Sequence, residues 1–243
     1  MPDLLKFEWF RDTAGYECAQ VKTAEELERY APQESWRPIL RMFWGISDRV
    51  GDNRYIVPKG GSRLRYDPLD QFPGAFREFA ENGATPADAV QFASRFGPLG
   101  LEKKLVGRAL FDLEILQIEP FWEWVKVQNE IRDAVESWER GRERGNLDQT
   151  ISLFSTMSLP ARVRLTKTHD ASRPALYLEP PTLCDAMWLQ FAQSVSADIQ
   201  FKRCAECPTW FPYGTGTGRR RSAFYCSERC RKAAHKRQST AVS

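Results

Sequence analysis

The sequence predicts an α+β fold in which a mainly helical N-terminal domain precedes a β-hairpin with a connecting helix and a small cysteine-rich module. Three patterns support this prediction. Segments before residue 159 repeat apolar residues every three or four positions, as amphipathic helices do. Two segments between residues 160 and 180 alternate apolar and polar residues, which is typical of β-strands. Four of the six cysteines then form two close pairs near the C-terminus.

These patterns divide the chain into four stretches. We expect residues 1–159 to form the helical domain, 160–199 the hairpin and connecting helix, 200–238 the cysteine-rich module, and 239–243 a disordered tail. A length of 243 residues leaves room for one large domain or two modest ones. No run of 18 apolar residues occurs, so we expect neither a membrane-spanning helix nor contact with a membrane.

Helix signals recur through the N-terminal domain. Thr23 and Glu26 have the spacing of a capping box, and Thr85 can cap a helix whose first residue is Pro86. Residues 50–68 are rich in turn formers around "RYIVP" and predict a loop or a short hairpin. Helices are predicted over residues 21–31, 67–83, 85–97, 119–141 and 147–158.

The longest of these helices carries an aromatic and aliphatic stripe at spacings of three and four. Such a stripe is typical of a helix face that packs into a core, rather than of a ligand site. Its members are Trp124, Gln128, Ile131, Val135 and Trp138.

The pattern changes period after this region. "ARVRLTKT" and "RPALYLEP" alternate apolar and polar residues around the turn "HDASR", which predicts a β-hairpin. An amphipathic helix, "PTLCDAMWLQFAQSVSAD", follows with Thr182 as its expected N-cap. This helix leads almost directly into the first cysteine pair.

The two cysteine pairs have the spacing of metal ligands. Two residues separate Cys204 from Cys207, so a tight turn can aim both sulfurs at one point. Three residues separate Cys226 from Cys230, about one helical turn, and Ser227 is suited to cap a helix there. Zn²⁺ prefers four such ligands in a tetrahedron, and four cysteines would leave no open position for catalysis. We therefore expect a structural zinc site on Cys204, Cys207, Cys226 and Cys230.

The stretch between the pairs completes the predicted module. "TWF" and "RSAFY" are short β-prone runs on either side of the turn "PYGTGTGRR". The order of knuckle, hairpin and helix, with ligands at the knuckle and at the helix start, is the plan of a treble-clef zinc finger. Such a module is too small to bury much core. The metal would therefore supply folding free energy, on the order of 10–16 kcal/mol for structural zinc in small peptides.

Other uses of the four thiols remain open at this point. An iron–sulfur cluster accepts the same ligands, and disulfides or free thiols are further alternatives. The start "MPDLLKFEWFRD" lacks the features of a secretion signal, so we expect a cytoplasmic, reducing setting that favours metal over disulfides. Cys18 and Cys184 have no close partner and are expected to be packing residues. His235 is read as a polar residue of the last helix.

The segment "RCAECPTWFPYGTGTGRRRSAFYCSERCRKAAHKR" resembles the C-terminal zinc fingers of the bacterial CGNR-type family. That resemblance covers roughly residues 160–238 and includes the hairpin and helix that lead into the finger. It implies a helical domain before the finger and a role in regulating transcription. The name-giving tetrapeptide is absent, because Cys230 is followed by Arg231, Lys232 and Ala233. The second pair is one residue closer than in that family, and "FYCSERC" is also similar to treble-clef modules with an FCS-like signature, including small gyrase-binding zinc proteins.

Positive charge gathers around the second cysteine pair. Residues 200–243 hold ten of the 35 basic residues and two of the 32 acidic ones, so this stretch carries +8 and the rest of the chain −5. Such asymmetry indicates an anionic partner, although a solvated charged tail would show it too. The residues expected to contact nucleic acid are Arg219, Arg220, Arg221, Arg229, Arg231, Lys232 and Lys236. Trp210, Phe211, Phe224 and Tyr225 could stack on bases, but are first expected to form the small core of the module.

The sequence favours a zinc-finger protein that binds nucleic acid, with double-stranded DNA as the expected partner and transcription regulation as the expected role. The alternative is a zinc-stabilised adaptor or inhibitor that docks its basic helix on an acidic surface of another protein. No nucleophile elbow, phosphate-binding loop or HExxH motif occurs, so we do not expect an enzyme.

Overall fold

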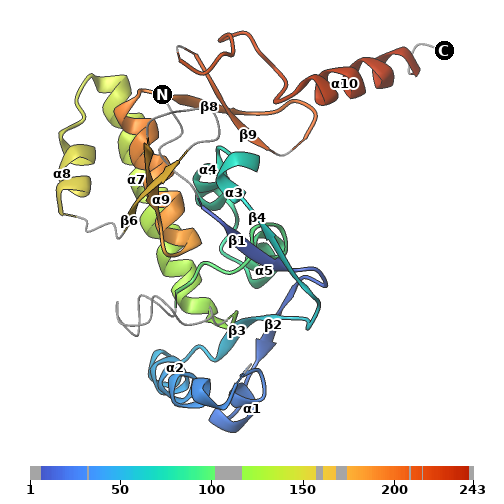
Figure 1. The fold of residues 1–243 in the computed structure, drawn as a ribbon, viewed down its shortest axis with the longest axis vertical. Coiled ribbons are helices and arrows are strands. Elements are labelled where there is room, and N and C mark those ends of the chain that lie inside the picture. Colours follow the sequence, from blue (N-terminus) through green and yellow to red (C-terminus); the bar gives the residue numbers. More distant parts are fainter. Residues whose placement is uncertain are drawn as a thin grey trace.

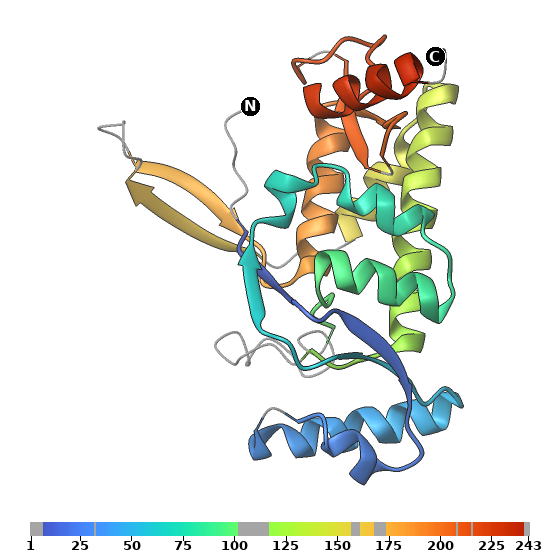
Figure 2. The same cartoon turned by 90° about the vertical axis from the view of Figure 1, so that its right-hand side faces the viewer.

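The computed structural model describes residues 7–31, 33–101, 117–156, 161–167, 174–207, 209–214 and 216–240. Over these residues it combines helices with small antiparallel sheets, which confirms the α+β prediction (Figure 1). Helices α7 (Phe121–Arg144) and α9 (Leu183–Ser196) run along the long axis of the molecule, and both contribute side chains to its main core. The last helix, α10 (Glu228–Thr240), lies at one end in both views (Figures 1 and 2).

Short strands from distant parts of the chain pair in the N-terminal half. They are β1 (Trp9–Asp12), β2 (Tyr16–Gln20), β3 (Arg54–Pro58), β4 (Arg63–Tyr66) and β5 (Glu119–Pro120). β1 pairs with β4, and β3 lies between β2 and β5; every pairing is antiparallel. The loop or local hairpin predicted at residues 50–68 is therefore wrong in its pairing. The β2 partners of β3 lie 34 to 42 residues earlier in the chain and the β1 partners of β4 51 to 57 residues earlier, and these pairings help to bury Trp9 and Tyr16.

Helices α1 (Ala24–Glu28) and α2 (Arg37–Val50) pack with β3 around a second, smaller core. Thr23 caps α1 as predicted, since its hydroxyl accepts from the Glu26 N–H at 3.2 Å. Helix α2 was not predicted from the sequence. It has a proline in its first turn and is capped at its end by Gly51, whose φ is 77°. A short 3₁₀ turn, Glu34–Trp36, leads into it.

The helix predicted over residues 67–83 is interrupted. The structure has α3 (Pro68–Gln71) and α4 (Ala75–Glu81), separated at Pro73 and Gly74. Proline has no N–H for an intrahelical bond, and this one breaks the periodic pattern. Helix α5 (Pro86–Phe96) forms where predicted, and Thr85 and Asp88 make a capping box at its start.

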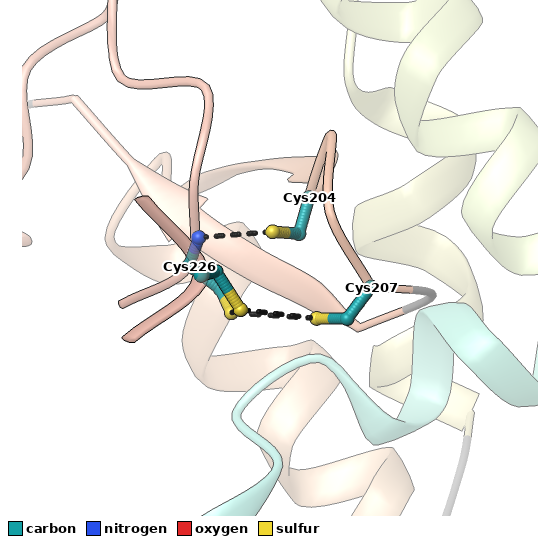
Figure 3. A group of neighbouring side chains, drawn as sticks. Cys204, Cys207 and Cys226 are labelled. Carbon is teal, nitrogen blue, oxygen red and sulfur yellow. Dashed lines mark hydrogen bonds between the residues drawn. The ribbon is translucent and has the colours of Figure 1, made fainter. Parts of the chain in front are cut away.

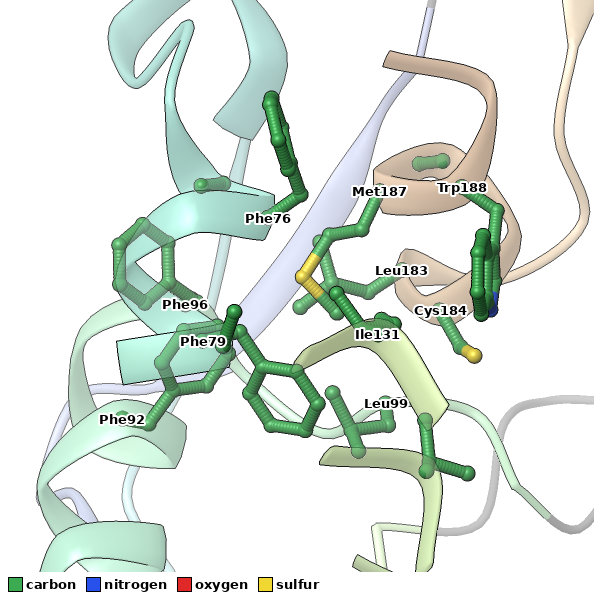
Figure 4. Packing of buried hydrophobic residues seen from close by; sticks show 14 of the residues in the cluster. Phe76, Phe79, Phe92, Phe96, Leu99, Ile131, Leu183, Cys184, Met187 and Trp188 are labelled. Carbon is green, nitrogen blue, oxygen red and sulfur yellow. The ribbon is translucent and has the colours of Figure 1, made fainter. Parts of the chain in front are cut away.

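The central core is rich in aromatic side chains. The five stripe residues predicted on α7 are all buried, which confirms that this face is core. Figure 4 shows side chains from α4, α5, α7 and α9 meeting in the cluster. The ring centre of Phe191 of α9 lies 5.7 Å from that of Trp138 of α7 and 5.2 Å from that of Phe76 of α4. α8 (Asp148–Thr156) packs beside α7.

A fully buried carboxylate fixes one corner of this core. Glu119 of β5 accepts from the N–H groups of Leu99, Gly100 and Leu101 at 2.6–2.8 Å, and from the Trp124 indole at 2.7 Å. Burial raises the pKa of Glu119 to about 7, although the four N–H bonds act in the opposite direction. Its two oxygens therefore anchor the chain just after α5 to the start of α7.

The predicted hairpin and its following helix are present. β6 (Arg162–Lys167) pairs antiparallel with β7 (Pro174–Glu179), and Thr182 caps α9 by accepting from the Asp185 N–H at 3.0 Å. The turn between the strands, with His169, lies outside the described residues. α9 packs into the same core as α4 and α7. Among the described helices, none has both the length and the apolar character that a bilayer crossing requires.

Candidate metal centre

The four cysteines of the two pairs meet at one point. Strands β8 (Gln200–Arg203) and β9 (Trp210–Tyr213) pair antiparallel, and Cys204 and Cys207 lie in the turn that joins them. Cys226 lies two residues before the start of α10, and Cys230 lies in its first turn. All four sulfur atoms lie within 4.8 Å of one another (Figure 3). The structure thus brings together the four predicted ligands and shows that they could hold a metal ion.

Backbone hydrogen bonds hold the first pair in a tight turn. The Cys204 N–H donates to the Thr209 carbonyl at 3.0 Å, which extends the β8–β9 ladder by one bond. The Ala205 N–H donates to the Phe224 carbonyl at 2.9 Å and brings the returning chain beside the turn. The Cys204 sulfur accepts N–H bonds from Cys226 at 3.3 Å and from Glu206 at 3.5 Å (Figure 3).

The start of α10 positions the second pair. The Ser227 hydroxyl accepts from the Cys230 N–H at 3.3 Å, and the Ser227 carbonyl accepts from the Arg231 N–H at 3.1 Å. Ser227 is therefore the N-cap that the sequence predicted. Since Cys226 and Cys230 are four residues apart, one turn of helix brings their sulfurs to 3.5 Å.

The distances between sulfurs fit a tetrahedral site. The Cys207 sulfur lies 3.6 Å from that of Cys226 and 3.7 Å from that of Cys230. Four sulfurs at about 2.3 Å from a central ion lie about 3.8 Å from each other. A disulfide would need about 2.05 Å. The spacing of the Cys207, Cys226 and Cys230 sulfurs therefore matches ligands around one ion, and the Cys204 sulfur lies within 4.8 Å of the other three.

Burial and hydrogen bonding shift the pKa values of two of these thiols in opposite directions. Burial opposes ionisation of Cys204, but the N–H groups of Cys226, Glu206 and Cys207 donate to its sulfur and lower the pKa of this thiol to about 7. Burial and hydrogen bonds with the neighbouring thiols raise the pKa of Cys226 to about 12. A cation at the centre would favour the thiolate form of every ligand.

The remaining metal-binding residue types lie elsewhere. Among the described residues, the four cysteines are the only group of three or more Cys, His, Asp or Glu side chains close enough to share an ion. Cys184 is buried in the central core, and Cys18 packs against it half-buried, as expected of packing residues. His235 is exposed on α10 and does not belong to the cluster.

The β8–β9 turn is attached to the body of the protein. Phe201 is buried, and its ring centre lies 5.2 Å from that of Phe76. Trp210 packs so closely on Gly74 that a Cβ added to this glycine would lie 2.6 Å from the tryptophan Cβ. Two polar contacts flank these rings. Arg203 forms an ion pair with Glu81 at 2.7 Å, and Arg95 donates to Thr209 at 3.0 Å. The first two cysteines therefore stand on a fixed platform.

One predicted strand is absent. Residues 221–225, the run "RSAFY", are not in a strand, and β9 pairs with the preceding β8 instead. Among the described residues beyond β9, the one β-type pairing is an isolated bridge between Gly214 and Arg219. The expected hairpin between the cysteine pairs is wrong because the chain before Cys204 provides the better partner, with Phe201 and Phe211 buried on the two strands.

The basic residues divide between a loop and a helix. Arg219, Arg220 and Arg221 line an open hollow together with Gly214, Gly216 and Gly218. The four basic residues predicted on α10 are all exposed: Arg229, Arg231, Lys232 and Lys236. Arg231 pairs with Glu228 at 2.7 Å, and Arg237 pairs with Glu206 on the turn between the first two cysteines. None of residues 228–237 is buried, so α10 projects from the body (Figure 1).

The aromatic residues near the site do not all serve as a core. Phe211 is buried, and Trp210 and Tyr225 are half-buried, as expected. Phe224 is different, because 67% of it is exposed. The sequence could not distinguish these positions, since burial here depends on which strands pair.

No protein-family model matches the chain, and no curated protein matches it in sequence.

Proposed function

We propose that the four cysteines bind one Zn²⁺ and that residues 200–238 form a small treble-clef-like zinc finger. The sulfur spacing supports a single tetrahedral ion, and thiolates are ligands that zinc accepts readily. Four cysteines close the coordination sphere, so the metal has a structural role. Metal analysis of freshly purified protein should give one zinc per chain. Iron in place of zinc would indicate a cluster, and absence of both metals would contradict the proposal.

We further propose that this finger binds double-stranded DNA and that the chain regulates transcription. The observation that carries the proposal is the exposed basic helix. Arg229, Lys232 and Lys236 follow one another at spacings of three and four, so they share one side of α10. The cysteine side of the helix holds Cys230 and Ala233 instead. A helix of 13 residues is about 20 Å long, and the major groove of DNA admits a helix of this diameter.

The local charge favours a phosphate partner. Among the described residues, neither Arg229 nor Lys232 forms an ion pair with a carboxylate, and neither do the three arginines of the loop. Contacts between such side chains and DNA phosphates release counterions, so the affinity falls steeply with salt. An acidic protein surface would also be attracted, but it lacks the regular charge of duplex DNA.

The salt dependence of binding tests the DNA proposal. Zinc-loaded wild type and a variant with Arg229, Arg231, Lys232 and Lys236 replaced by Ala should be titrated with duplex DNA at several salt concentrations. The slope of log affinity against log salt should flatten by about 0.9 for each phosphate contact removed. Because all four side chains are exposed, the variant should keep its zinc and its melting temperature.

A matched control removes the same charge elsewhere. Lys22, Arg29, Arg49 and Lys59 are exposed and lie in or next to α1, α2 and β3. Figure 1 shows these elements far from α10. Their replacement by Ala should leave the salt slope unchanged. Equal slopes for the wild type and the α10 variant would remove this helix from the DNA surface. That result would favour the adaptor or inhibitor, in which α10 docks on an acidic protein.

A further inference from the structure

The backbone of Phe224, whose ring is exposed, is tied to the cysteine turn. Its carbonyl accepts from the Ala205 N–H at 2.9 Å, and Cys226 follows two residues later as a metal-centre residue. The backbone on which the ring stands is therefore tied to the cysteine turn, although 67% of the residue is exposed. Phe224 is the only aromatic residue among the large hydrophobic residues found exposed in the described part of the chain.

One cationic group lies beside this ring. The Lys202 ammonium lies 5.7 Å from the centre of the Phe224 ring and 4.5 Å from that of Tyr213. The same ammonium donates to the Arg221 carbonyl at 2.6 Å, so it joins the aromatic rings to the arginine run. No carboxylate pairs with Lys202 among the residues that the structure describes. The exposed ring thus stands at the edge of a positively charged surface.

The arginine run itself borders the open hollow described above. Gly214, Gly216 and Gly218 have φ angles of 101°, 80° and 69°, a conformation that glycine adopts without strain. Nothing lies within 4 Å of the position that a Cβ would take at any of the three. The loop therefore leaves its surface open for a ligand to approach the backbone and the three arginines.

We propose that this surface binds an unpaired nucleotide. The base stacks on Phe224, and Lys202 with Arg219, Arg220 and Arg221 attracts the adjoining phosphates. Nucleobases stack on exposed aromatic rings whatever their sequence, and basic grooves follow the phosphates beside them. A paired base offers its face only to its neighbours in the helix. The zinc finger would therefore prefer DNA with an unpaired stretch over fully paired DNA. This inference rests on the proposed binding of DNA.

Three DNA probes of equal length test the preference: a duplex, a single strand, and a duplex with a short central bubble. The full zinc-loaded chain should bind the bubble more tightly than the duplex. Phe224→Leu keeps an apolar side chain but removes the aromatic face. It should weaken binding to the single strand and the bubble by roughly 5- to 150-fold, and binding to the duplex by less than about twofold. Phe224→Trp keeps an aromatic face and should therefore bind all three probes about as tightly as the wild type.

A second measurement does not depend on a variant. A 2-aminopurine placed in the bubble should change its fluorescence when wild-type protein binds, and should change less with Phe224→Leu. Equal weakening on all three probes, or no fluorescence change at saturation, would overturn the stacking proposal. Duplex binding with a steep salt slope but no effect of Phe224→Leu would overturn it and leave DNA binding intact. A protein that binds none of the probes would overturn both proposals.

Discussion

The central core and α10 are held in place by different means. Around α4, α7 and α9, buried aromatic rings fill the space between helices, and the buried Glu119 carboxylate accepts four N–H bonds. On α10, no residue from 228 to 237 is buried. A free helix of this length is marginal in water, because few hydrogen bonds repay the cost of its first turn. Burial therefore stabilises the body, whereas α10 contacts the rest of the chain mainly through the cysteine cluster at its start, which could hold a metal ion.

Loss of the proposed metal should have the largest effect, and it should affect α10 far more than the body. Cys207→Ser should abolish metal binding and release residues 214–240, while β8, β9 and the helices of the body stay folded, because the proposed metal would be the main source of stability beyond β9. Limited proteolysis followed by mass spectrometry would detect new cleavage in this segment.

Cys18→Ser is the matched control, since Cys18 lies outside the metal centre. It should keep both metal and protease resistance. A Cys207→Ser protein with wild-type metal content and wild-type resistance would show that α10 is held by something else.

Deletion of a core ring should produce the reverse effect. Phe191 is fully buried and contacts Phe76, Trp138 and Phe154. Phe191→Ala should lower the free energy of unfolding by about 3–5 kcal/mol, because it removes buried surface and leaves a cavity. Urea denaturation at constant metal would measure this loss.

Ile151, 57% exposed on α8, provides the control for that substitution. Ile151→Ala should change stability by about 0.5 kcal/mol or less. A loss below about 1 kcal/mol for Phe191→Ala would mean that the body does not depend on this cluster.

The buried carboxylate allows a finer test of the body. Glu119→Gln keeps the shape of the side chain but turns an NH₂ group toward N–H donors that now lack an acceptor. Each unsatisfied buried N–H costs about 1–3 kcal/mol. Hydrogen exchange should speed up at Leu99, Gly100 and Leu101, with α10 unaffected. Unchanged protection of these amides would show that the four bonds do not fix the loop.

The smallest expected effect concerns the other end of α10. Arg237 pairs with Glu206, which ties the helix back to the cysteine turn. Exposed ion pairs contribute little, so Arg237→Ala should leave metal content and melting unchanged. Faster hydrogen exchange confined to the last turn of α10 is the expected trace. A loss of metal would show that this pair, and not only the cysteines, holds the helix.

The sequence predicted the parts of the molecule that local rules determine. Spacing identified the four cysteines, and cap residues located the starts of α5 and α9 at Thr85 and Thr182. The periodic stripe on α7 identified a core face correctly. In each case the informative residues lie within one or two turns of each other along the chain.

Predictions that depend on distant segments were less successful. β1 and β2 were missed, and the pairing of β3 and β4 with them joins residues far apart in the sequence. The predicted strand at residues 221–225 is absent for the same reason, because β9 pairs with β8, which precedes the first cysteine pair. Phe224 is exposed because its segment pairs with no strand, and the local sequence does not show which strands pair.

The platform beneath Cys204 and Cys207 has a consequence for the order in which ligands engage. Trp210 on Gly74 and the buried Phe201 fix the first pair before any ion arrives. An entering ion would therefore meet two sulfurs that are already in place, so binding to them would lose little further conformational entropy. Capture of the second pair then closes a loop of 18 intervening residues, and the entropy of that closure grows only slowly with length. The body thus acts as a template that should raise metal affinity above that of the excised peptide.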